Sequence, residues 1–533
     1  MADLTKLPLP AAIPTFPTSR RAADAIRTRF GTAAPAGALT LAAQTPNTDE
    51  THWTDHSGSY SKGLKQDTPG VVNPNAFIAF RNALGTSDGK TLPNPTSSFE
   101  LVTLGGPAKL NDPQGAFARQ PVGSDSQAFA APAAPTVDSR DYAVELIELY
   151  WASLLRDVAF TDYAGNPIAK LAAAELTNHT AHYSGPKSGG AVTPDLLFRG
   201  GFRGELVGPY ISQFCIFPTE FGGQHIDQAM QAYLPGRDFM TEQPEWFKIQ
   251  NGGGPTDALT NDPLHRYMQN GRALAAFTHV DELYQAYFTA YLVMSSWGVS
   301  LNHGTPYSPA SATPYTRQKA FGTFGGPDIA ATLGAVAKTA LNAVWYQKWV
   351  VHLRHRPEAG GGLVHLQKVG TPFPPMAQVH PIVLTSNALA ASHDRYGSYL
   401  LSQAFPEGSP LHPAYPTGHG SVAGACITAL KFFFSCEQKV QKYAQPIAPT
   451  SDGLSRPAYV GADASMMTIT GELHKLAHNI SFGHGIHAGI HWRSDTDASI
   501  RFGEAVALAF LQDQVWFYNE DVSIDIHKID GGV

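Results

Sequence analysis

The spacing of apolar residues predicts a mainly helical chain. After Asp138 or Ser139, either of which can cap a helix N-terminus, apolar residues recur at three- and four-residue intervals. This stripe consists of Val144, Ile147, Trp151, Leu154 and Val158. Two further helical stripes follow position 271, and their aromatic members are of the kind that fills a core. They consist of Ala276, Val280, Leu283, Tyr287, Tyr291 and Met294, and then of Ile329, Leu333, Val336, Ala340, Val344 and Tyr346.

The same pattern predicts three more helices near the C-terminus and loops elsewhere. Helices are expected over 419–439, 464–482 and 495–518, and the alternation over 522–526 predicts a short terminal strand. Gly, Pro, Ser and Asn are frequent over 31–135, which predicts loops with short helices. At the N-terminus the pattern indicates an extended Pro-rich arm over 1–20 and a short helix over 20–28.

The clearest break in the pattern is Gly252-Gly253-Gly254-Pro255. It divides the chain into an N-terminal helical and loop half, 1–265, and a C-terminal helical bundle, 266–533. Large helical enzymes can keep one continuous core, so we expect the two halves to form one structural unit.

Composition narrows the class of protein. Charged residues make up 15% of the chain and glycine and proline number 50 and 40, which indicates a globular protein rather than a coiled coil or a disordered acidic chain. The net charge of −7 argues against a nucleic-acid partner. The three cysteines are too few and too scattered for a disulfide framework or a zinc cluster, and Cys426 is expected to be a buried free thiol.

Nothing in the sequence indicates export or a membrane span. The N-terminus lacks a basic segment followed by an apolar one, so a cytoplasmic location is the default expectation, with export left open. The longest apolar candidate, 284–299, is interrupted by polar residues and falls short of the ~20 residues that a span requires.

The stretch 412–425 combines a Pro-rich segment with the start of a helix. The residues before its two prolines are pushed away from helical dihedral angles, and a run of small residues begins after Gly418. Thr417 and His419 therefore flank a predicted helix N-terminus, where unpaired N–H groups and the helix dipole attract a tetrahedral oxyanion. Taken alone, the stretch favours the simpler interpretation, a Pro-rich turn capped by Thr417.

A second candidate element is a pair of cations. Lys348 precedes Arg356 by eight residues, a rise of about 12 Å on a continuous helix, so the two side chains converge only if the chain turns. We expect Pro357 to supply that turn and Arg356 to lie at the helix end. Two adjacent cations with only Glu358 close in sequence indicate an anion site, although a solvated basic face is the alternative.

A third element pairs a histidine with a carboxylate. Asp495 follows His491 by four residues, which places both on one helix face one turn apart. The carboxylate can then hold one ring nitrogen and present the other. A polar pair on a helix surface is the alternative interpretation of this spacing.

Together the three elements resemble the motifs of the vanadium-dependent haloperoxidase and acid phosphatase superfamily. These motifs are Lys followed by Arg-Pro, then Pro-Ser-Gly-His, then Arg and His with a trailing Asp. Here they are Lys348 through Arg356-Pro357, Pro416-Thr417-Gly418-His419, and His491 with Asp495. Three further stretches resemble the red-algal and cyanobacterial bromoperoxidases, namely 149–157, 208–214 and 356–359. The resemblance implies a fold of two four-helix bundles.

The resemblance also implies a role for each motif residue. His491 bonds directly to vanadium and Asp495 orients it, while His419 takes a proton from hydrogen peroxide and Lys348 polarises the bound peroxide. The residues implied to hold the vanadate oxygens are Arg356, Thr417 and the amide of Gly418. Vanadate and phosphate share charge and tetrahedral shape, so one cage can serve both chemistries.

The chain departs from the family pattern at two positions. Thr417 stands where serine is usual, and it keeps the hydroxyl group. Six residues before His491, where the family has a second arginine, this chain has Gly485, or His484 in an alternative alignment. Neither is a permanent cation, so vanadate affinity is the property that this departure affects. If His484 reaches the oxyanion, it can donate a hydrogen bond.

His412 bears on the choice of halide. It lies seven residues before His419, at a position that tends to be His in the family's bromoperoxidases and Phe in the fungal chloroperoxidases. The resemblance therefore favours bromide and iodide over chloride. The alternative is a loop histidine bonded to backbone.

Three other functions remain open on the sequence. Four residues whose spacing could line one helix could coordinate a divalent ion, although that would leave the two cations unexplained. They are His484, His487, His491 and Asp495. A phosphohydrolase would use His491 as nucleophile and His419 as leaving-group acid. An assembly protein with a vestigial site is the non-enzymatic alternative.

The prediction drawn from the resemblance is a vanadium-dependent bromoperoxidase. It would use orthovanadate and hydrogen peroxide to oxidise bromide or iodide, and the product would halogenate small organic acceptors. A structural divalent cation is left open. The family tends to form homodimers and larger symmetric homo-oligomers, and no membrane or nucleic-acid partner is expected.

Overall fold

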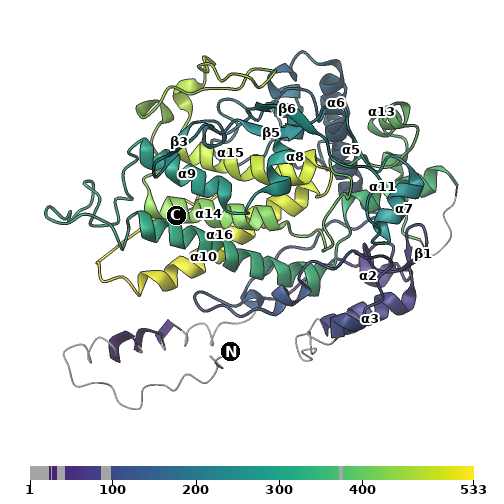
Figure 1. Ribbon diagram of the computed structural model, residues 1–533, viewed down its shortest axis with the longest axis horizontal. Coiled ribbons are helices and arrows are strands. Elements are labelled where there is room, and N and C mark those ends of the chain that lie inside the picture. The colour runs from purple at the N-terminus through teal and green to yellow at the C-terminus, as the bar shows by residue number, and fades with distance from the viewer. Residues whose placement is uncertain are drawn as a thin grey trace.

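The computed structural model describes residues 23–25, 27–29, 31–32, 42–85, 98–370 and 376–532 of the 533-residue chain. Helices dominate these residues and the strands are short, which confirms the predicted mainly helical class (Figure 1). The three short N-terminal ranges are helical, whereas the predicted arm over 1–20 lies outside the described residues.

The elements follow one another along the chain in this order. The α-helices are α2 Asp49–His52, α3 Pro74–Leu84, α5 Arg140–Leu155, α6 Pro167–Thr177, α7 Gln243–Gln250, α8 Gly271–Val280, α9 Gln285–Ser296, α10 Gly326–Tyr346, α11 Pro357–Lys368, α12 Pro381–Leu384, α13 Asn387–Tyr396, α14 Gly418–Phe433, α15 Ile469–Phe482 and α16 Arg493–Val515. Two π-helical segments are η8 Gln347–His352 and η11 Gly483–His487. The strands are β1 Gln66–Thr68, β2 Val71–Val72, β3 Thr219–Phe221, β4 Gln224–Ile226, β5 Met230–Tyr233 and β6 Asn261–Arg266, which form the antiparallel pairs β1–β2, β3–β4 and β5–β6.

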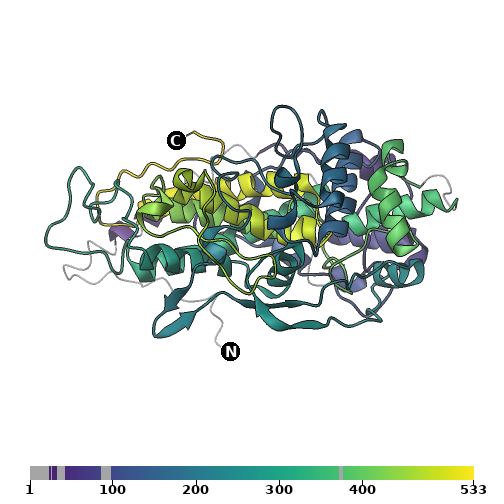
Figure 2. The same ribbon diagram turned by 90° about the horizontal axis from the view of Figure 1, so that it is seen from above.

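The C-terminal part is built around α14, which contacts α10, α15 and α16 (Figures 1 and 2). Every residue of α14 is buried, as expected for a helix at the centre of a bundle. Glycines let α14 and α16 approach closely, because a Cβ at Gly424 would lie 1.9 Å from the Ile500 carbonyl oxygen and a Cβ at Gly503 1.9 Å from that of Ser421. The N-terminus of α14 is thereby fixed by a closely packed helix pair.

A second group of helices surrounds α5, against which α6, α11, α12 and α13 pack. Ser139 caps α5, since its hydroxyl accepts a hydrogen bond from Tyr142 N–H at 3.2 Å, which confirms one of the two predicted caps. Two buried carboxylates on α5 reach the third sequence motif: Glu145 accepts a hydrogen bond from Ser494 N–H and Glu148 from Arg493. The second helix group therefore supports the segment that begins α16.

The apolar stripe from Ala276 to Met294 spans two helices rather than one. α8 ends at Val280, which is 77% exposed, and Asp281 has extended dihedral angles of φ −71° and ψ 148°. A new helix, α9, begins at Gln285. The prediction of a single helical stripe is wrong because the apolar residues keep their helical spacing across the four-residue break. The break places Asp281 at a helix end.

The terminal strand predicted over 522–526 is also wrong. Ser523 N–H donates to the Gly304 carbonyl at 2.9 Å, and the Asn302 side-chain amide donates to the Asp525 carbonyl at 3.3 Å. These bonds hold the segment against a loop without forming a ladder.

All three cysteines are buried free thiols, as predicted for Cys426. Within the described part of the chain, no helix combines the length and apolarity needed to cross a bilayer.

Candidate active site

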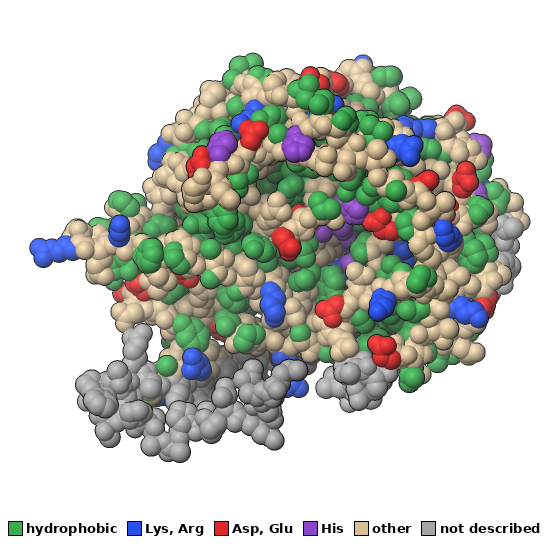
Figure 3. Space-filling model, in the orientation of Figure 1, with side chains coloured by type: hydrophobic (Ala, Val, Ile, Leu, Met, Phe, Trp, Pro, Cys, Tyr) green, Lys and Arg blue, Asp and Glu red, His purple; other side chains and the backbone are tan. Residues whose placement is uncertain are grey.

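The predicted site residues come together where α10, α14 and the segment before α16 meet. They are Lys348, Arg356, His412, Thr417, Gly418, His419, His484, His491 and Asp495. Figure 3 shows histidine side chains gathered in a recess of one face of the molecule. Among the site residues, His412, His419 and His484 are 7–9% exposed, whereas Arg356 and His491 are 1% exposed. Three of the imidazoles therefore lie nearest to solvent, with Arg356 and His491 beneath them.

A π-helical segment and a left-handed residue bring Lys348 and Arg356 together. α10 passes into η8, which carries Lys348, and Leu353 then adopts φ 45° and ψ 34°. Arg356 follows as the N-cap of α11, with Pro357 at the first helical position. The turn predicted at Pro357 is therefore made earlier, at Leu353, and the proline starts the next helix. π-helical turns are rare in proteins, and those that do occur are frequently found at functional sites.

Lys348 is buried against neutral acceptors. Its Nζ donates to the carbonyl oxygens of Pro413 at 2.9 Å and Ala414 at 2.7 Å. Burial, followed by the nearby charge of Arg356, holds the pKa of Lys348 well below its ordinary value. A bound anion would reverse this effect by stabilising the ammonium.

Arg356 likewise has no acidic partner. Its guanidinium donates to the carbonyl oxygens of His412 and Ile490, both at 3.0 Å, and to His491 Nε2 at 2.7 Å. Burial lowers the pKa of Arg356 to about 10. The nearby carboxylates are paired elsewhere: Glu358 bonds Lys62 at 2.5 Å and Asp495 bonds a different arginine. Among the described residues, no carboxylate forms an ion pair with Arg356 or with Lys348.

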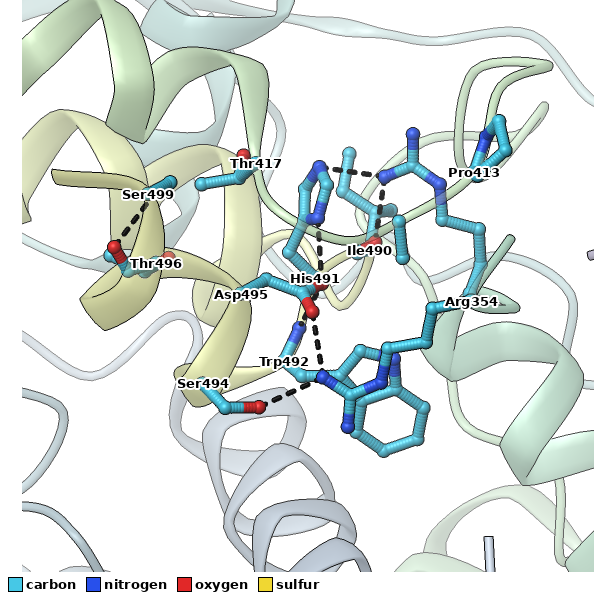
Figure 4. A network of polar contacts seen from close by, with 12 residues as sticks. Arg354, Pro413, Thr417, Ile490, His491, Trp492, Ser494, Asp495, Thr496 and Ser499 are labelled. Carbon is cyan, nitrogen blue, oxygen red and sulfur yellow. Dashed lines mark hydrogen bonds and ion pairs between the residues drawn. The ribbon is translucent and has the colours of Figure 1, made fainter. Parts of the chain in front are cut away.

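His491 is held in one tautomer with one nitrogen presented to the cage (Figure 4). Its Nδ1–H donates to Asp495 Oδ2 at 2.9 Å, so Nε2 carries the lone pair that faces Arg356. Asp495 is fixed in turn by Arg354, which donates to its Oδ1 at 2.7 Å and also to Glu145 Oε2 at 3.1 Å. Burial, followed by Arg356 and Lys348, holds the pKa of His491 well below its ordinary value. The ring is therefore neutral, and its Nε2 lone pair, which accepts a hydrogen bond from Arg356 in this structure, is the one that could act as a ligand.

The sequence interpretation missed Arg354. It lies two residues before Arg356, and Figure 4 shows it on the far side of Asp495 from His491. No local sequence signal separates Arg354 from Arg356, because the partners Asp495 and Glu145 lie 141 and 209 residues away along the chain.

The N-terminus of α14 is left uncapped. Thr417 is the N-cap residue, yet its side chain makes no capping hydrogen bond, and its buried Oγ1 has no partner among the described residues. Gly418 is the first helical residue and packs against Trp345, with space for little more than a Cβ. An uncapped helix N-terminus with a free hydroxyl beside it is suited to an oxyanion.

His419 is oriented by a carboxylate from another helix end. Its Nε2 lies 2.9 Å from Asp281 Oδ1, and the Asp281 side chain is 2% exposed. The carboxylate accepts the Nε2 proton, which leaves Nδ1 of His419 as the acceptor. No local sequence signal marks Asp281, because it lies 138 residues from its partner and its place depends on the break between α8 and α9.

His484 faces the same cage from η11. Its ring stacks on His419 with centroids 3.9 Å apart, and it lies 5.7 Å from the His491 ring. Burial, followed by the charges of its neighbours, holds the pKa of His484 well below its ordinary value. Gly485 contributes only backbone, and a Cβ there would meet the His491 Cβ at 3.2 Å.

The divalent-ion interpretation is wrong. His487, two residues beyond Gly485, points away from the cage, since its Nε2 contacts Tyr210 Oη at 3.0 Å and its ring packs against Phe160 and Phe198. Within the described residues, no group of three His, Cys, Asp or Glu side chains could hold a metal ion. The spacing suggested convergence, but the wide π-helical turn of η11 turns His484 and His487 in different directions.

His412 lies beside Arg356 at the edge of the cage. Its ring is within 3.0 Å of the guanidinium, and it packs on Trp345 with ring centroids 4.7 Å apart. Burial, followed by Arg356 and Lys348, holds the pKa of His412 well below its ordinary value. It also contacts the Pro413 carbonyl at 3.1 Å, so the predicted backbone bond and the predicted place at the site are both present.

These features define a buried cage for a tetrahedral oxyanion. Two cations lack acidic partners, a helix N-terminus is uncapped, and the Thr417 hydroxyl is unbonded among the described residues. His491 Nε2 supplies the nitrogen lone pair that a vanadium centre requires, and its Asp495 partner is typical of metal-bound histidines. The residues present therefore fit vanadate.

Comparisons with known proteins agree with this class. The chain matches no protein-family model. It is 30% identical to the vanadium-dependent bromoperoxidase of Corallina officinalis, over 89% of this chain and 90% of that protein. It is 32% identical to the vanadium-dependent bromoperoxidase of Ascophyllum nodosum, over 90% of this chain and 86% of that protein.

A solved structure shows the same fold. It is the homohexameric second vanadate-dependent bromoperoxidase of Ascophyllum nodosum, which superposes with a TM-score of 0.88 at 28% identity, covering 99% of this chain and 94% of that one. The protein belongs to the vanadium-dependent bromoperoxidase family.

Proposed function

We propose that this protein uses vanadate and hydrogen peroxide to oxidise bromide, and also iodide, to a hypohalous species that halogenates small organic compounds. The observation that carries the proposal is His491, whose Nε2 is held toward the buried guanidinium of Arg356, a cation that lacks an acidic partner among the described residues. The relatives are bromoperoxidases over most of the chain, which favours this function over phosphate-ester hydrolysis.

The cage residues bind and orient. His491 Nε2 would be the vanadium ligand, while Arg356, Lys348, the Gly418 amide and the Thr417 hydroxyl would hold the oxyanion. When bound, vanadate supplies a Lewis-acidic centre that activates peroxide toward attack by halide. The cations take up the charge of the oxyanion, which a buried site could not hold otherwise.

His419 moves the proton. Asp281 accepts a hydrogen bond from Nε2–H, which leaves Nδ1 free to accept a proton. Nδ1 would take this proton from hydrogen peroxide as the peroxide binds, and would later return a proton to the peroxide oxygen that leaves. The Asp281 carboxylate, bonded to Nε2, would stabilise the imidazolium formed in between. Lys348 would polarise the peroxide by donating a hydrogen bond to it.

His412 sets the choice of halide. Its ring lies on Trp345 at the edge of the cage, beside the Arg356 guanidinium, where it would contact an approaching halide. A polarisable bromide or iodide suits this mixed aromatic and imidazole wall better than the strongly hydrated chloride.

We further propose that the chain forms a homo-oligomer. The solved bromoperoxidase with the same fold is a homohexamer, and it matches 99% of this chain.

The test is peroxide-dependent bromination of a dione reporter by vanadate-free protein, before and after orthovanadate is added. Activity that requires vanadate and is suppressed by inorganic phosphate is expected, because both oxyanions compete for one cage. Turnover of an aryl phosphate without bromination at saturating vanadate would instead establish the phosphohydrolase function.

A further inference from the structure

We propose that His484 is a binding residue of the oxyanion cage, which it completes by donating a hydrogen bond from Nδ1–H to an oxygen of the tetrahedral anion. The inference rests on the proposed function and adds a residue to its site. It adds a fourth side-chain donor to the cage, an imidazole rather than a permanent cation.

The position of His484 supports this assignment. η11 continues α15 with a wider turn, and this turn brings the ring onto the wall between His419 and His491. The ring stacks on His419 at 3.9 Å with an angle of 28° between planes, and its centroid lies 5.7 Å from that of His491. A group held between the vanadium ligand and the proton-transfer residue adjoins the space that the anion fills.

The hydrogen bonding of His484 is incomplete. The side chain is 9% exposed, and its enclosed Nδ1 has no hydrogen-bond partner among the described residues. A buried polar atom without a partner is costly, so it needs a ligand or ordered water. Thr417 Oγ1 is unpartnered in the same cage, and one tetrahedral anion can satisfy both atoms.

His487 provides a contrast within the same π-helical segment. Its Nδ1 also has no hydrogen-bond partner among the described residues, but the residue is 0% exposed. Its Nε2 contacts Tyr210, and its ring packs against the rings of Phe160 and Phe198. No ligand can approach that ring. Of the two histidines, only His484 combines an unpartnered nitrogen with a place at the recess.

The charges around His484 identify the ligand as an anion. The largest electrostatic effects on the ring come from His419, His491, Arg356 and Lys348, and none of these groups is acidic. A cation would be repelled by Arg356 and Lys348. Asp281 is acidic, but one of its oxygens is bonded to His419.

The experiment measures oxyanion binding directly. Dissociation constants for orthovanadate and, separately, for inorganic phosphate are determined by equilibrium dialysis with elemental analysis, on the full chain. The variants are His484→Leu, which removes both nitrogens, and His484→Asn, whose amide nitrogen can occupy the place of Nδ1. His265→Leu, an exposed position on β6, is the matched control. Thermal unfolding without anion monitors folding.

The expected result is a dissociation constant about tenfold or more higher for His484→Leu, with both anions. His484→Asn should recover most of the affinity, and His265→Leu should match the parent protein. Equal affinities of the parent and His484→Leu proteins would overturn the inference, and an Asn variant as weak as the Leu variant would overturn the assignment to Nδ1.

The two proposals fail in different ways. If the parent protein binds vanadate but does not brominate, the proposed oxidation fails while the affinity series still decides the role of His484. If the parent binds neither anion at millimolar concentration, the cage itself is refuted and both proposals fall.

Discussion

Arg354 and Arg356 lie two residues apart and are both buried, yet their surroundings are opposite. Arg354 bonds Asp495 at 2.7 Å and Glu145 at 3.1 Å. Arg356 bonds only carbonyl oxygens and imidazole rings among the described residues. Burial alone would lower both pKa values, but the two carboxylates outweigh it and raise the pKa of Arg354, whereas the pKa of Arg356 is lowered to about 10.

The contrast separates a structural cation from a binding cation. A buried charge is tolerated when an opposite charge accompanies it. Removing one member of such a pair leaves the other as an uncompensated buried charge, which is strongly destabilising. A buried charge without such a partner is destabilising until an anion arrives. The same contrast recurs in histidines of one continuous helical stretch, since His478 lies between Glu205 and Asp497 while His484 faces only bases and cations.

The largest effect is expected when the structural arginine is removed. Arg354→Met should lower the free energy of unfolding by about 3–5 kcal/mol, because Glu145 and Asp495 would be left as buried, unpaired carboxylates. Chemical denaturation of the vanadate-free protein measures this loss. An Arg354→Met protein as stable as its parent would show that the carboxylates do not depend on this pairing.

His478 should make stability depend on pH. Burial alone would lower its pKa, but Glu205 and Asp497 outweigh burial and raise it to about 9 from 6.5. The stabilisation is therefore complete below pH 6.5 and is lost as the pH rises through 9, by roughly 3 kcal/mol. Denaturation at both ends of this window, for the parent and His478→Gln, gives the difference. Equal pH dependence in the two proteins would contradict the prediction.

Replacement of the binding arginine should weaken anion binding without weakening the fold. Arg356→Met is expected to raise the vanadate dissociation constant by at least about 100-fold, because two charge-assisted hydrogen bonds are lost. Thermal unfolding without vanadate should be unchanged or shifted upward, since the unpaired charge is gone. A large loss of stability would place Arg356 in the same class as Arg354.

The smallest effect is expected at the helix N-terminus. Thr417→Val keeps the shape of the side chain and removes the hydroxyl, which should raise the vanadate dissociation constant by about tenfold. Thr417→Ser keeps the hydroxyl and serves as the control, with affinity close to that of the parent. Identical binding by the Val and Ser variants would show that Oγ1 does not reach the anion.

Much of the fold was accessible from the sequence because it depends on local periodicity. The helix over Arg140–Leu155 and the long helix ending at Tyr346 both follow apolar spacing, and Ser139 caps the first as its residue type suggests. The anion cage was accessible because its residues cluster in three short motifs with characteristic chemistry. The terminal segment 522–526 has no such motif. Its alternation of apolar and polar residues accompanies packing on a loop rather than a strand.

The remaining features depend on contacts between distant segments or on irregular backbone. Asp281 reaches His419 only because the chain breaks between α8 and α9, and apolar spacing continues across that break. Arg354 is distinguished from Arg356 by Glu145, which lies on another helix. Leu353 makes the turn that was assigned to Pro357. The sequence did not reveal this because a left-handed leucine has no sequence signature.

The π-helical segments η8 and η11 bear on how readily this protein could lose its function through deletions. A π-helical turn is an α-helical turn that contains one additional residue. Deleting one residue from either segment would restore regular α-helical hydrogen bonding and rotate the side chains before the deletion by about 100° relative to those after it. Such a shortened chain would carry Lys348 or His484 on the wrong side of the cage. The loss of a single codon at either place would therefore remove a cage residue without changing its type.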